Sequence, residues 1–298
     1  MIARILNAVL PHVPRAMMWP IARRYVAGVT LEEALTKLRE LRALGHPGII
    51  DILGEDVKDA AAARAVVHRY VEASDAVARA GLDAYVSVKP THVGLRTSEA
   101  LALELYEQLA VHCAGHGQLL RVEMEDHTTT DATLRVFGAL RARHPRVGIV
   151  LQSRLLRTPA DVDALTAQPG LDVRMVKGIY LEPAAIAHTE PEPIRKAFLD
   201  LSRTLLERGA RVAFATHDGP LAQDLLAVVR ELGVPPERHE FEVLLGVQQR
   251  LWDLWRGQGH TVRVYVPYGP EWQPYSLRRL RKNPEILKHV VKATLGLG

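Results

Sequence analysis

The sequence predicts a (β/α)8 barrel, with helices before the first strand and a final helix that covers the barrel mouth. Eight short runs with strand-like composition recur along the chain, each followed by a segment with helical spacing. The runs are too apolar to alternate cleanly between polar and apolar residues, which is typical of parallel strands covered on both faces. Eight even units also need no edge strand, so a closed barrel is favoured over a doubly wound open sheet.

The predicted elements follow from these patterns in chain order. The strands are expected at Gly48–Leu53, Ala84–Lys89, Leu119–Met124, Gly148–Ser153, Val173–Lys177, Arg211–Thr216, Glu240–Leu245 and Thr261–Val266. Ala- and Leu-rich segments such as Ala60–Ala80 and Ser98–Cys113 have helical spacing. Residues 1–45 are expected to form a helical extension, in which Thr30-Leu-Glu-Glu has the signature of a capping box. No linker or low-complexity tract interrupts the chain, so we expect one domain over residues 1–298.

Composition narrows the classes of function. The chain has 298 residues, of which 48% are hydrophobic, and this is enough for one large α/β barrel. The net charge of +4 is not concentrated in any run, so we expect no nucleic-acid partner. The single cysteine, Cys113, excludes an intrachain disulfide and fits a reducing, cytoplasmic setting. No signal peptide and no run of about 18 apolar residues is found, while a peripheral contact with the inner membrane stays open.

Polar residues lie at the C-terminal ends of nearly all the predicted strands, where barrels of this class carry their active sites. In chain order they are Glu55, Lys89, Glu123, Glu125, Asp126, Gln152, Arg174, Lys177, Thr216, His217, Asp218, Glu242, Tyr265 and Tyr268. Polar groups in apolar strands cost free energy unless they are paired, so the clustering indicates a site. Three cations at one rim, Lys89, Arg174 and Lys177, favour an anionic ligand. The alternative is that these are ordinary mouth residues in contact with solvent.

A basic face is predicted on the final helix. Tyr275, Arg278, Arg279 and Lys282 share this face by helical spacing. Paired arginines can hold a carboxylate through forked hydrogen bonds. The alternatives are a solvated basic face and a helix that contacts nucleic acid.

Other signals are weaker. His112 and His116 have the spacing of metal ligands, but no acid is recognised beside them, so we expect a surface pair and no metal site. Trp252 and Trp255 are expected to serve packing. No glycine-rich phosphate loop is found, so a dinucleotide-binding fold is unsupported.

Several ordered segments resemble the proline dehydrogenase family. The segments are DILGE at Asp51–Glu55, VSVKPTHVGL at Val86–Leu95, GIVLQSRLLRT at Gly148–Thr158, VRMVKGIYLEP at Val173–Pro183, FATHD at Phe214–Asp218 and VYVPYGPEWQPYSLRRL at Val264–Leu280. The resemblance runs from about Arg24 to the C-terminus. It implies non-covalent FAD at the barrel mouth and oxidation of L-proline to 1-pyrroline-5-carboxylate, with electrons passed to a quinone. A pyrroline-5-carboxylate dehydrogenase is a further partner that it suggests.

The resemblance also implies roles for individual residues. The flavin contacts would be Gln152, Arg174, Lys177, Gly178, Thr216 and His217. The substrate side would be formed by Lys89, Arg278 and Arg279 as a clamp on the carboxylate, by Tyr180, Tyr265 and Tyr275 around the pyrrolidine ring, and by Glu123. Lys177 or Arg174 would stabilise the reduced flavin anion.

The chain departs from the family pattern more at the substrate end than at the flavin end. Glu123, Ile179, Glu242 and Lys282 stand where the family usually has Asp, Ala, Gln and Glu, and Arg154, Leu156 and Gln273 stand where it usually has Tyr. Two further hypotheses therefore stay open: oxidation of another cyclic or secondary amino acid, and flavin binding with little turnover. A Schiff-base aldolase that uses Lys177 and a basic RNA-binding module are alternatives that the motifs disfavour.

Overall fold

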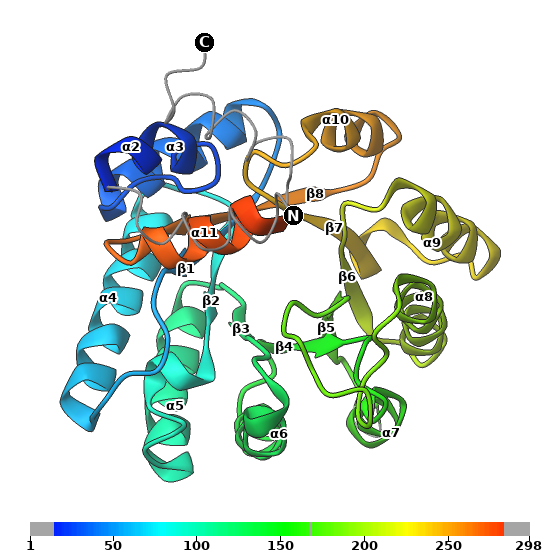
Figure 1. Cartoon of the computed structure of the whole chain (residues 1–298), viewed down its shortest axis with the longest axis horizontal. Helices are drawn as coiled ribbons and strands as arrows, with labels where there is room; N and C mark the ends of the chain where they lie inside the picture. Colours follow the sequence, from blue (N-terminus) through cyan, green and yellow to red (C-terminus); the bar gives the residue numbers. More distant parts are fainter. Residues whose placement is uncertain (1–14, 167–168, 283–298) are drawn as a thin grey trace, which may run out of the picture.

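Eight parallel strands form a closed barrel at the centre of the molecule (Figure 1). The structure is a computed structural model that describes residues 15–166 and 169–282. In chain order the strands are β1 (Gly48–Ile52), β2 (Ala84–Val88), β3 (Leu120–Val122), β4 (Val147–Gln152), β5 (Asp172–Val176), β6 (Arg211–Ala215), β7 (His239–Leu244) and β8 (Val262–Tyr268). Strand β8 closes the ring by pairing with β1 from Gly48↔Val264 to Ile52↔Tyr268. The predicted fold class is confirmed, the open sheet is wrong, and each strand end lies within two residues of its predicted place.

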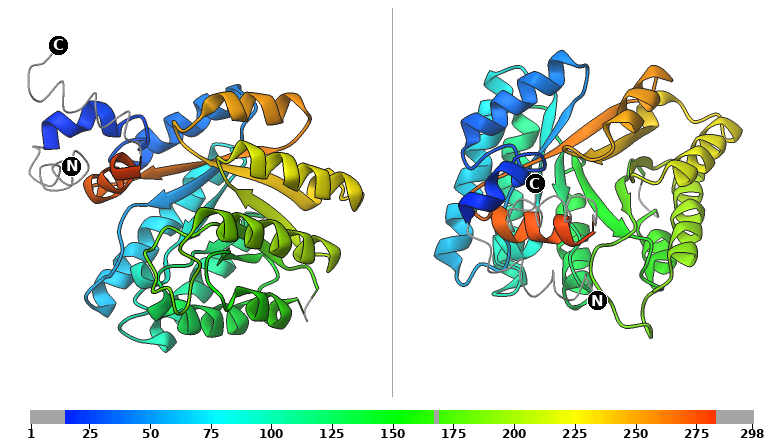
Figure 2. Two further views of the ribbon diagram at one scale, coloured as in Figure 1. Left: turned by 45° about the vertical axis from the view of Figure 1, so that its right-hand side comes forward. Right: turned by 45° about the horizontal axis from the view of Figure 1, so that its top comes forward.

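Helices surround the barrel, as Figures 1 and 2 show. Those between strands are α4 (Ala60–Arg79), α5 (Glu99–Gly115), α6 (His127–Arg141), α7 (Thr158–Leu165), α8 (Pro191–Glu207), α9 (Gly219–Glu231) and α10 (Gln249–Gly257), with short 3-10 turns η2 (Pro90–Val93) and η3 (Pro236–Arg238). Helices α2 (Arg15–Ala22) and α3 (Leu31–Ala43) precede β1. Thr30 caps α3, and the predicted capping box with Glu33 is present. Residues 1–14 of the predicted helical extension lie outside the described residues.

The final helix, α11 (Trp272–Lys282), lies in front of the barrel in Figure 1 and beside α2. The rings of Trp19 and Trp272 pack with their centroids 5.0 Å apart. Tyr275 and Trp272 join Leu53, which follows β1, in a small buried cluster. This apolar contact fixes α11 at the same end of the barrel as the C-terminal end of β1.

The main apolar core lies between the barrel and the helices. Outward strand residues such as Ile50, Val86 and Val122 join Leu105 and Leu109 of α5 in one continuous buried cluster. Each such side chain contributes about 1.5–3 kcal/mol by leaving water. The predicted packing role of the tryptophans is confirmed, because Trp252 and Trp255 are buried in this cluster.

The inside of the barrel is polar. Asp172 and Arg174 of β5 alternate with buried apolar residues, and so do Glu240 and Glu242 of β7. The expectation that the strands lack polar–apolar alternation is therefore wrong for these strands. Charged side chains are tolerated there because they pair across the barrel, which offsets much of the cost of burial.

Candidate active site

The charged side chains inside the barrel form two layers. The lower layer, toward the N-terminal ends of the strands, consists of Arg121, Asp172, Arg211, Glu240 and Arg263. Arg121 has no exposed surface and pairs with Asp172 at 2.6 Å. Arg211 pairs with Asp172 at 3.1 Å and with Glu240 at 2.8 Å, and Glu240 also accepts from Arg263 at 3.1 Å. The lower layer is therefore a continuous chain of alternating charges.

The upper layer, toward the C-terminal ends of the strands, consists of Asp51, Lys89, Glu123, Arg174 and Tyr265. Lys89 donates to both carboxylate oxygens of Asp51, at 2.8 and 3.0 Å. Burial raises the Asp51 pKa, and this is opposed mainly by Lys89 and to a smaller extent by Tyr265. Burial opposes the charge on Lys89, but the nearby carboxylates, led by Asp51, outweigh it and raise the Lys89 pKa.

Arg174 is the centre of the second group in the upper layer. It donates to Glu123 at 2.5 Å and also pairs with Glu242, and its guanidinium lies 5.5 Å from the ring centroid of Tyr265. Burial disfavours the charge, yet Glu242 and Glu123 more than compensate, so the pKa of Arg174 is raised well above its ordinary value. Burial likewise opposes ionisation of Glu242, but Arg174 and Arg121 lower the Glu242 pKa to about 2. The Arg174 charge is thus permanent and held in place.

Polar side chains also converge after β5 and β6. Lys177 pairs with Asp218 at 2.5 Å, and Arg195 of α8 reaches the same carboxylate at 2.9 Å. Thr216 accepts a hydrogen bond from the backbone N–H of Asp218 at 3.1 Å. His217 accepts one from the backbone N–H of Leu244 at 3.0 Å through its Nε2.

Gln152 and Gly178 lie close together beside these residues, and we call this pair the cradle. Gln152 is buried and donates through Nε2 to the backbone carbonyl of Glu125 at 2.7 Å. Its Oε1 is buried without a hydrogen-bond partner among the described residues. Gly178 has a φ of +97°, and a Cβ placed there would lie 2.7 Å from this oxygen. The cradle therefore offers an acceptor to a ligand N–H, at a point that any side chain at position 178 would obstruct.

The aromatic residues predicted for the substrate side lie on three elements. Tyr265 is half-buried on β8, Tyr275 is buried on α11, and Tyr180 is half-buried in the segment after β5. Arg278, Arg279 and Lys282 belong to α11, but their side chains lie outside what the structure describes. The arginine clamp and the effect of Lys282 therefore stay predictions.

Two expectations from the sequence need correction. The three cations at the rim do not by themselves require an anionic ligand, because Lys89, Arg174 and Lys177 each have a carboxylate partner. His112 and His116 do have an acid nearby, since Asp75 of α4 bonds to both. Sequence spacing could not show either result, because each pairing joins residues on different elements.

Sequence reasoning also left Asp51 and Arg195 out of the predicted site. Asp51 carried a signal, since it is the one charged residue in the apolar strand GIIDI and opens the DILGE segment. Arg195 carried none, because it lies on α8, far along the chain from the Asp218 that it contacts.

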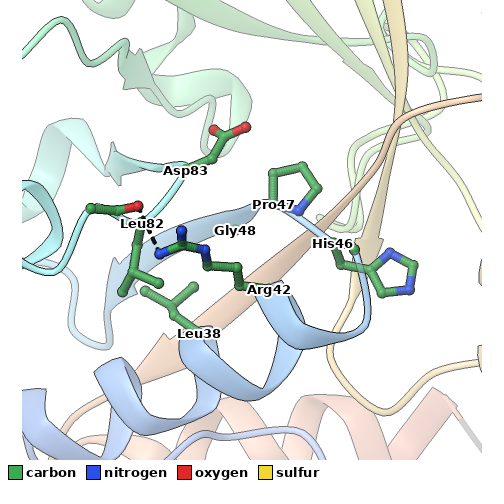
Figure 3. A pocket seen from close by; sticks show the side chains of 9 residues that line it. Leu38, Arg42, His46, Pro47, Gly48, Leu82 and Asp83 are labelled. Atoms are coloured by element: carbon green, nitrogen blue, oxygen red, sulfur yellow. Dashed lines mark hydrogen bonds between the residues drawn. The ribbon is translucent and has the colours of Figure 1, made fainter.

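Pockets also occur away from this site. One of about 310 Å³ lies at the opposite end of the barrel, before β1 and β2, and Figure 3 shows Arg42 reaching across it. Arg42 donates there to the backbone carbonyl of Gly81 at 3.1 Å. Since barrels of this class react at the other end, this pocket is not the candidate active site.

Comparison with known proteins identifies the family. The family model described as proline dehydrogenase matches residues 34–292. The chain belongs to the proline dehydrogenase family. The predicted resemblance and the assignment as an oxidoreductase are thereby confirmed.

Individual relatives agree with this assignment. The chain is 33% identical to proline dehydrogenase of Deinococcus radiodurans, over 94% of this chain and 92% of the relative. It is 31% identical to proline dehydrogenase 1 of Bacillus subtilis strain 168, over 92% of this chain and 90% of the relative. A crystal structure of proline utilization A from Bdellovibrio bacteriovorus, inactivated by N-propargylglycine, matches the fold with a TM-score of 0.82 at 22% identity, and the match covers 88% of this chain and 32% of that one.

Proposed function

We propose that this protein oxidises L-proline to 1-pyrroline-5-carboxylate, with FAD bound non-covalently at the barrel mouth. The observation that carries the proposal is the cradle of Gln152 and Gly178 at the C-terminal ends of neighbouring strands, within a chain of this family. Residues 1–298 would work as one FAD-binding domain.

The residues present fit a flavin. The buried acceptor Oε1 of Gln152 suits the imide N–H of an isoalloxazine ring, and the lack of a side chain at Gly178 keeps this oxygen clear, since a Cβ there would meet Gln152 and Arg154. Arg174 and Lys177 would supply positive charge for the edge of the flavin ring that becomes anionic on reduction. Thr216 and His217 would be the remaining flavin contacts. When bound, FAD supplies the hydride acceptor.

The protein's own contribution is to bind and orient proline. Lys89, held by Asp51, presents an ammonium group to the substrate carboxylate, and Arg278 and Arg279 of α11 would complete the clamp. Tyr180, Tyr265 and Tyr275 would form the walls of the ring pocket, with Glu123 beside them through its bond to Arg174. Holding the proline ring in one orientation lowers the entropic part of the reaction barrier. The proposed oxidation requires no nucleophile from the protein.

A second candidate substrate is another cyclic or secondary amino acid. Ile179 is half-buried between Gly178 and Tyr180, where the added bulk would narrow the ring pocket. Lys282 would add a further positive charge to the clamp. Under this hypothesis the double variant Ile179→Ala, Lys282→Glu gains activity on proline, and under the first it does not.

Other expectations remain parts of the proposal. We infer a quinone as electron acceptor and a cytoplasmic location, with a peripheral contact at the inner membrane and no nucleic-acid partner. Among the described residues no helix is both long and apolar enough to span a bilayer. Matches to bifunctional PutA proteins, such as that of Escherichia coli at 26% identity over 88% of this chain and 23% of the relative, support a link to a pyrroline-5-carboxylate dehydrogenase.

The first test is colour. The purified protein should be yellow with flavin absorbance, and L-proline should bleach it under anaerobic conditions. Prolinamide should bleach it far more slowly, because a truncated partner in a closed charge pair costs about 2–5 kcal/mol. A colourless protein that takes up no added FAD would refute the proposal. Equally fast bleaching by prolinamide would refute the assignment of the cationic residues as a clamp on the substrate carboxylate.

A pair of glycine variants tests the cradle. Gly178→Ala should lower bound flavin by at least about tenfold, since the new Cβ obstructs Gln152 in addition to straining the backbone. Gly209→Ala is the matched control, because its φ of +88° is similar and no atom lies within 4 Å of the added Cβ. Equal flavin content in the two variants would show that the cradle does not hold the cofactor.

A further inference from the structure

Two outer helices bring three metal-binding side chains together away from the barrel mouth. His112 and His116 lie one turn apart on α5, and Asp75 lies on the neighbouring helix α4 (Figure 1). The Nε2 atoms of the two histidines lie 2.9 and 2.7 Å from the same carboxylate oxygen of Asp75. One potential ligand atom from each residue lies within 4.8 Å of the other two.

We propose that Asp75, His112 and His116 form a binding site for a divalent first-row transition metal, with Zn²⁺ the expected ion, that joins α4 to α5. Two imidazoles and one carboxylate suit Zn²⁺, Cu²⁺ or Ni²⁺, whereas Mg²⁺ and Ca²⁺ prefer a shell of oxygen atoms. A water molecule would take the fourth position of a tetrahedral Zn²⁺.

The geometry needs little adjustment to accept the ion. Zn²⁺ binds imidazole nitrogen at about 2.0–2.1 Å, which sets tetrahedral ligand atoms about 3.3 Å apart. The carboxylate oxygen is now closer than that to both nitrogens, so a small outward rotation of the side chains is enough. The two imidazole rings are 5.1 Å apart and inclined at 78°, which lets both Nε2 atoms point at one place.

Helix α4 is held against α5 and against the segment that follows α5 independently of any ion. Ser74, next to Asp75, donates to the side chain of Gln118 at 2.6 Å, and Gln118 donates back to the Ser74 carbonyl at 3.0 Å. Arg64 of α4 pairs with Glu104 of α5 at 2.6 Å farther along the helices. These contacts pre-organise the three ligands, so the ion does not have to bring the helices together.

Position and exposure indicate a structural role. The histidines lie at the C-terminal end of α5, just before β3, and therefore at the end of the barrel opposite the candidate active site. Side-chain exposures of 28%, 33% and 33% for His112, His116 and Asp75 leave a path for the ion and for a bound water. The alternative is a hydrogen-bonded cluster in which both histidines donate Nε2–H to Asp75.

Zinc titration of the tag-free, flavin-loaded protein, first treated with a chelator, tests the site. Calorimetry with ZnCl₂ near pH 7.5 should give one ion per chain with a Kd below about 10 μM, and saturation should raise the Tm by about 2–6 °C. The variant His112→Gln, His116→Gln should weaken binding at least about 100-fold and abolish the Tm shift. His68→Gln, an exposed histidine on α4, is the matched control and should behave as the unchanged protein.

Two results would overturn the proposal. One is a Kd above about 100 μM for the unchanged protein. The other is tight binding that persists in the double variant, which would place the ion elsewhere. Since glutamine can replace the hydrogen bonds to Asp75, the double variant should fold, and its melting curve without zinc verifies this. Asp75→Asn gives an independent check, because it removes the carboxylate charge and should weaken zinc binding by tens of times.

Discussion

The two layers inside the barrel use the same chemistry but connect their charges differently. In the lower layer, Arg121, Asp172, Arg211, Glu240 and Arg263 form one unbroken chain of ion pairs. In the upper layer, the Lys89–Asp51 ion pair is separate, whereas Arg174 pairs with Glu123 and, through Glu242, approaches Arg121 of the lower layer. We therefore expect the continuous network to serve stability and the separate Lys89–Asp51 pair to present its cation to a ligand.

The largest effect should come from breaking the lower layer. Arg121→Met removes the nearer cation of Asp172, which then keeps only Arg211, and one of the cations beside Glu242, and it should lower the free energy of unfolding by about 3–5 kcal/mol. Urea unfolding measures this. The KM for proline in the folded fraction should change less than about twofold. A variant as stable as the unchanged protein would refute the structural role of the lower layer.

The dependence of stability on pH gives a second test of the comparison. His92 lies close after Lys89 in the sequence, and the positive charge of Lys89 affects the His92 pKa. Burial, and then the positive charge of Lys89, lowers the His92 pKa to about 3. The unfolded chain binds a proton near pH 6.5 and the folded chain does not, so this stability is complete above pH 6.5 and is lost as pH falls toward 3. Relative to His92→Gln, the protein should lose about 3 kcal/mol of unfolding free energy between pH 7 and pH 4. A constant difference across this range would contradict the assignment.

A matched pair of Asp→Asn changes separates the two layers directly. Asp51→Asn removes the carboxylate that pairs with Lys89 and should lower kcat/KM for proline by about 10–50-fold. This corresponds to a loss of about 1.4–2.3 kcal/mol of transition-state stabilisation. Asp172→Asn in the lower layer should reduce stability while kcat/KM stays within about twofold. Steady-state kinetics and thermal unfolding of the two variants measure these effects. Similar losses of kcat/KM in both variants would contradict the proposed difference in role between the two layers.

The smallest effect should come from an ion pair outside both layers. Arg135 and Glu99 join α6 to α5 at 2.5 Å, with 61% and 44% of their side chains exposed. Because solvent screens this pair, Arg135→Met should change the free energy of unfolding by less than about 1 kcal/mol. A loss as large as that of Arg121→Met would mean that burial does not set the cost.

Local pattern was enough to predict the strands, but it could not show which residues pair. The runs of Val and Ile and the Thr30 capping signature depend on neighbours in the chain, so the elements were predicted nearly to their ends. Tyr85 and Glu242, by contrast, bond across the barrel although they are 157 positions apart. Asp75 and His112 meet only because α4 packs on α5. Family motifs supplied candidate roles for Lys89 and Arg174, whereas their partners Asp51 and Glu242 became clear only in three dimensions.

The closing strand has a consequence for synthesis of the protein in the cell. Arg263 of β8 donates to the backbone carbonyl of Gly48 in β1, 215 positions earlier, and β8 supplies the last member of the lower layer. A nascent chain that has not yet released β8 from the ribosome exposes the unpaired edges of β1 and β7 and leaves Glu240 without one of its cations. Barrel closure therefore requires β8, which is synthesised after the other seven strands. Chains that are truncated before β8 should depend on chaperones or aggregate, however well their earlier βα units form.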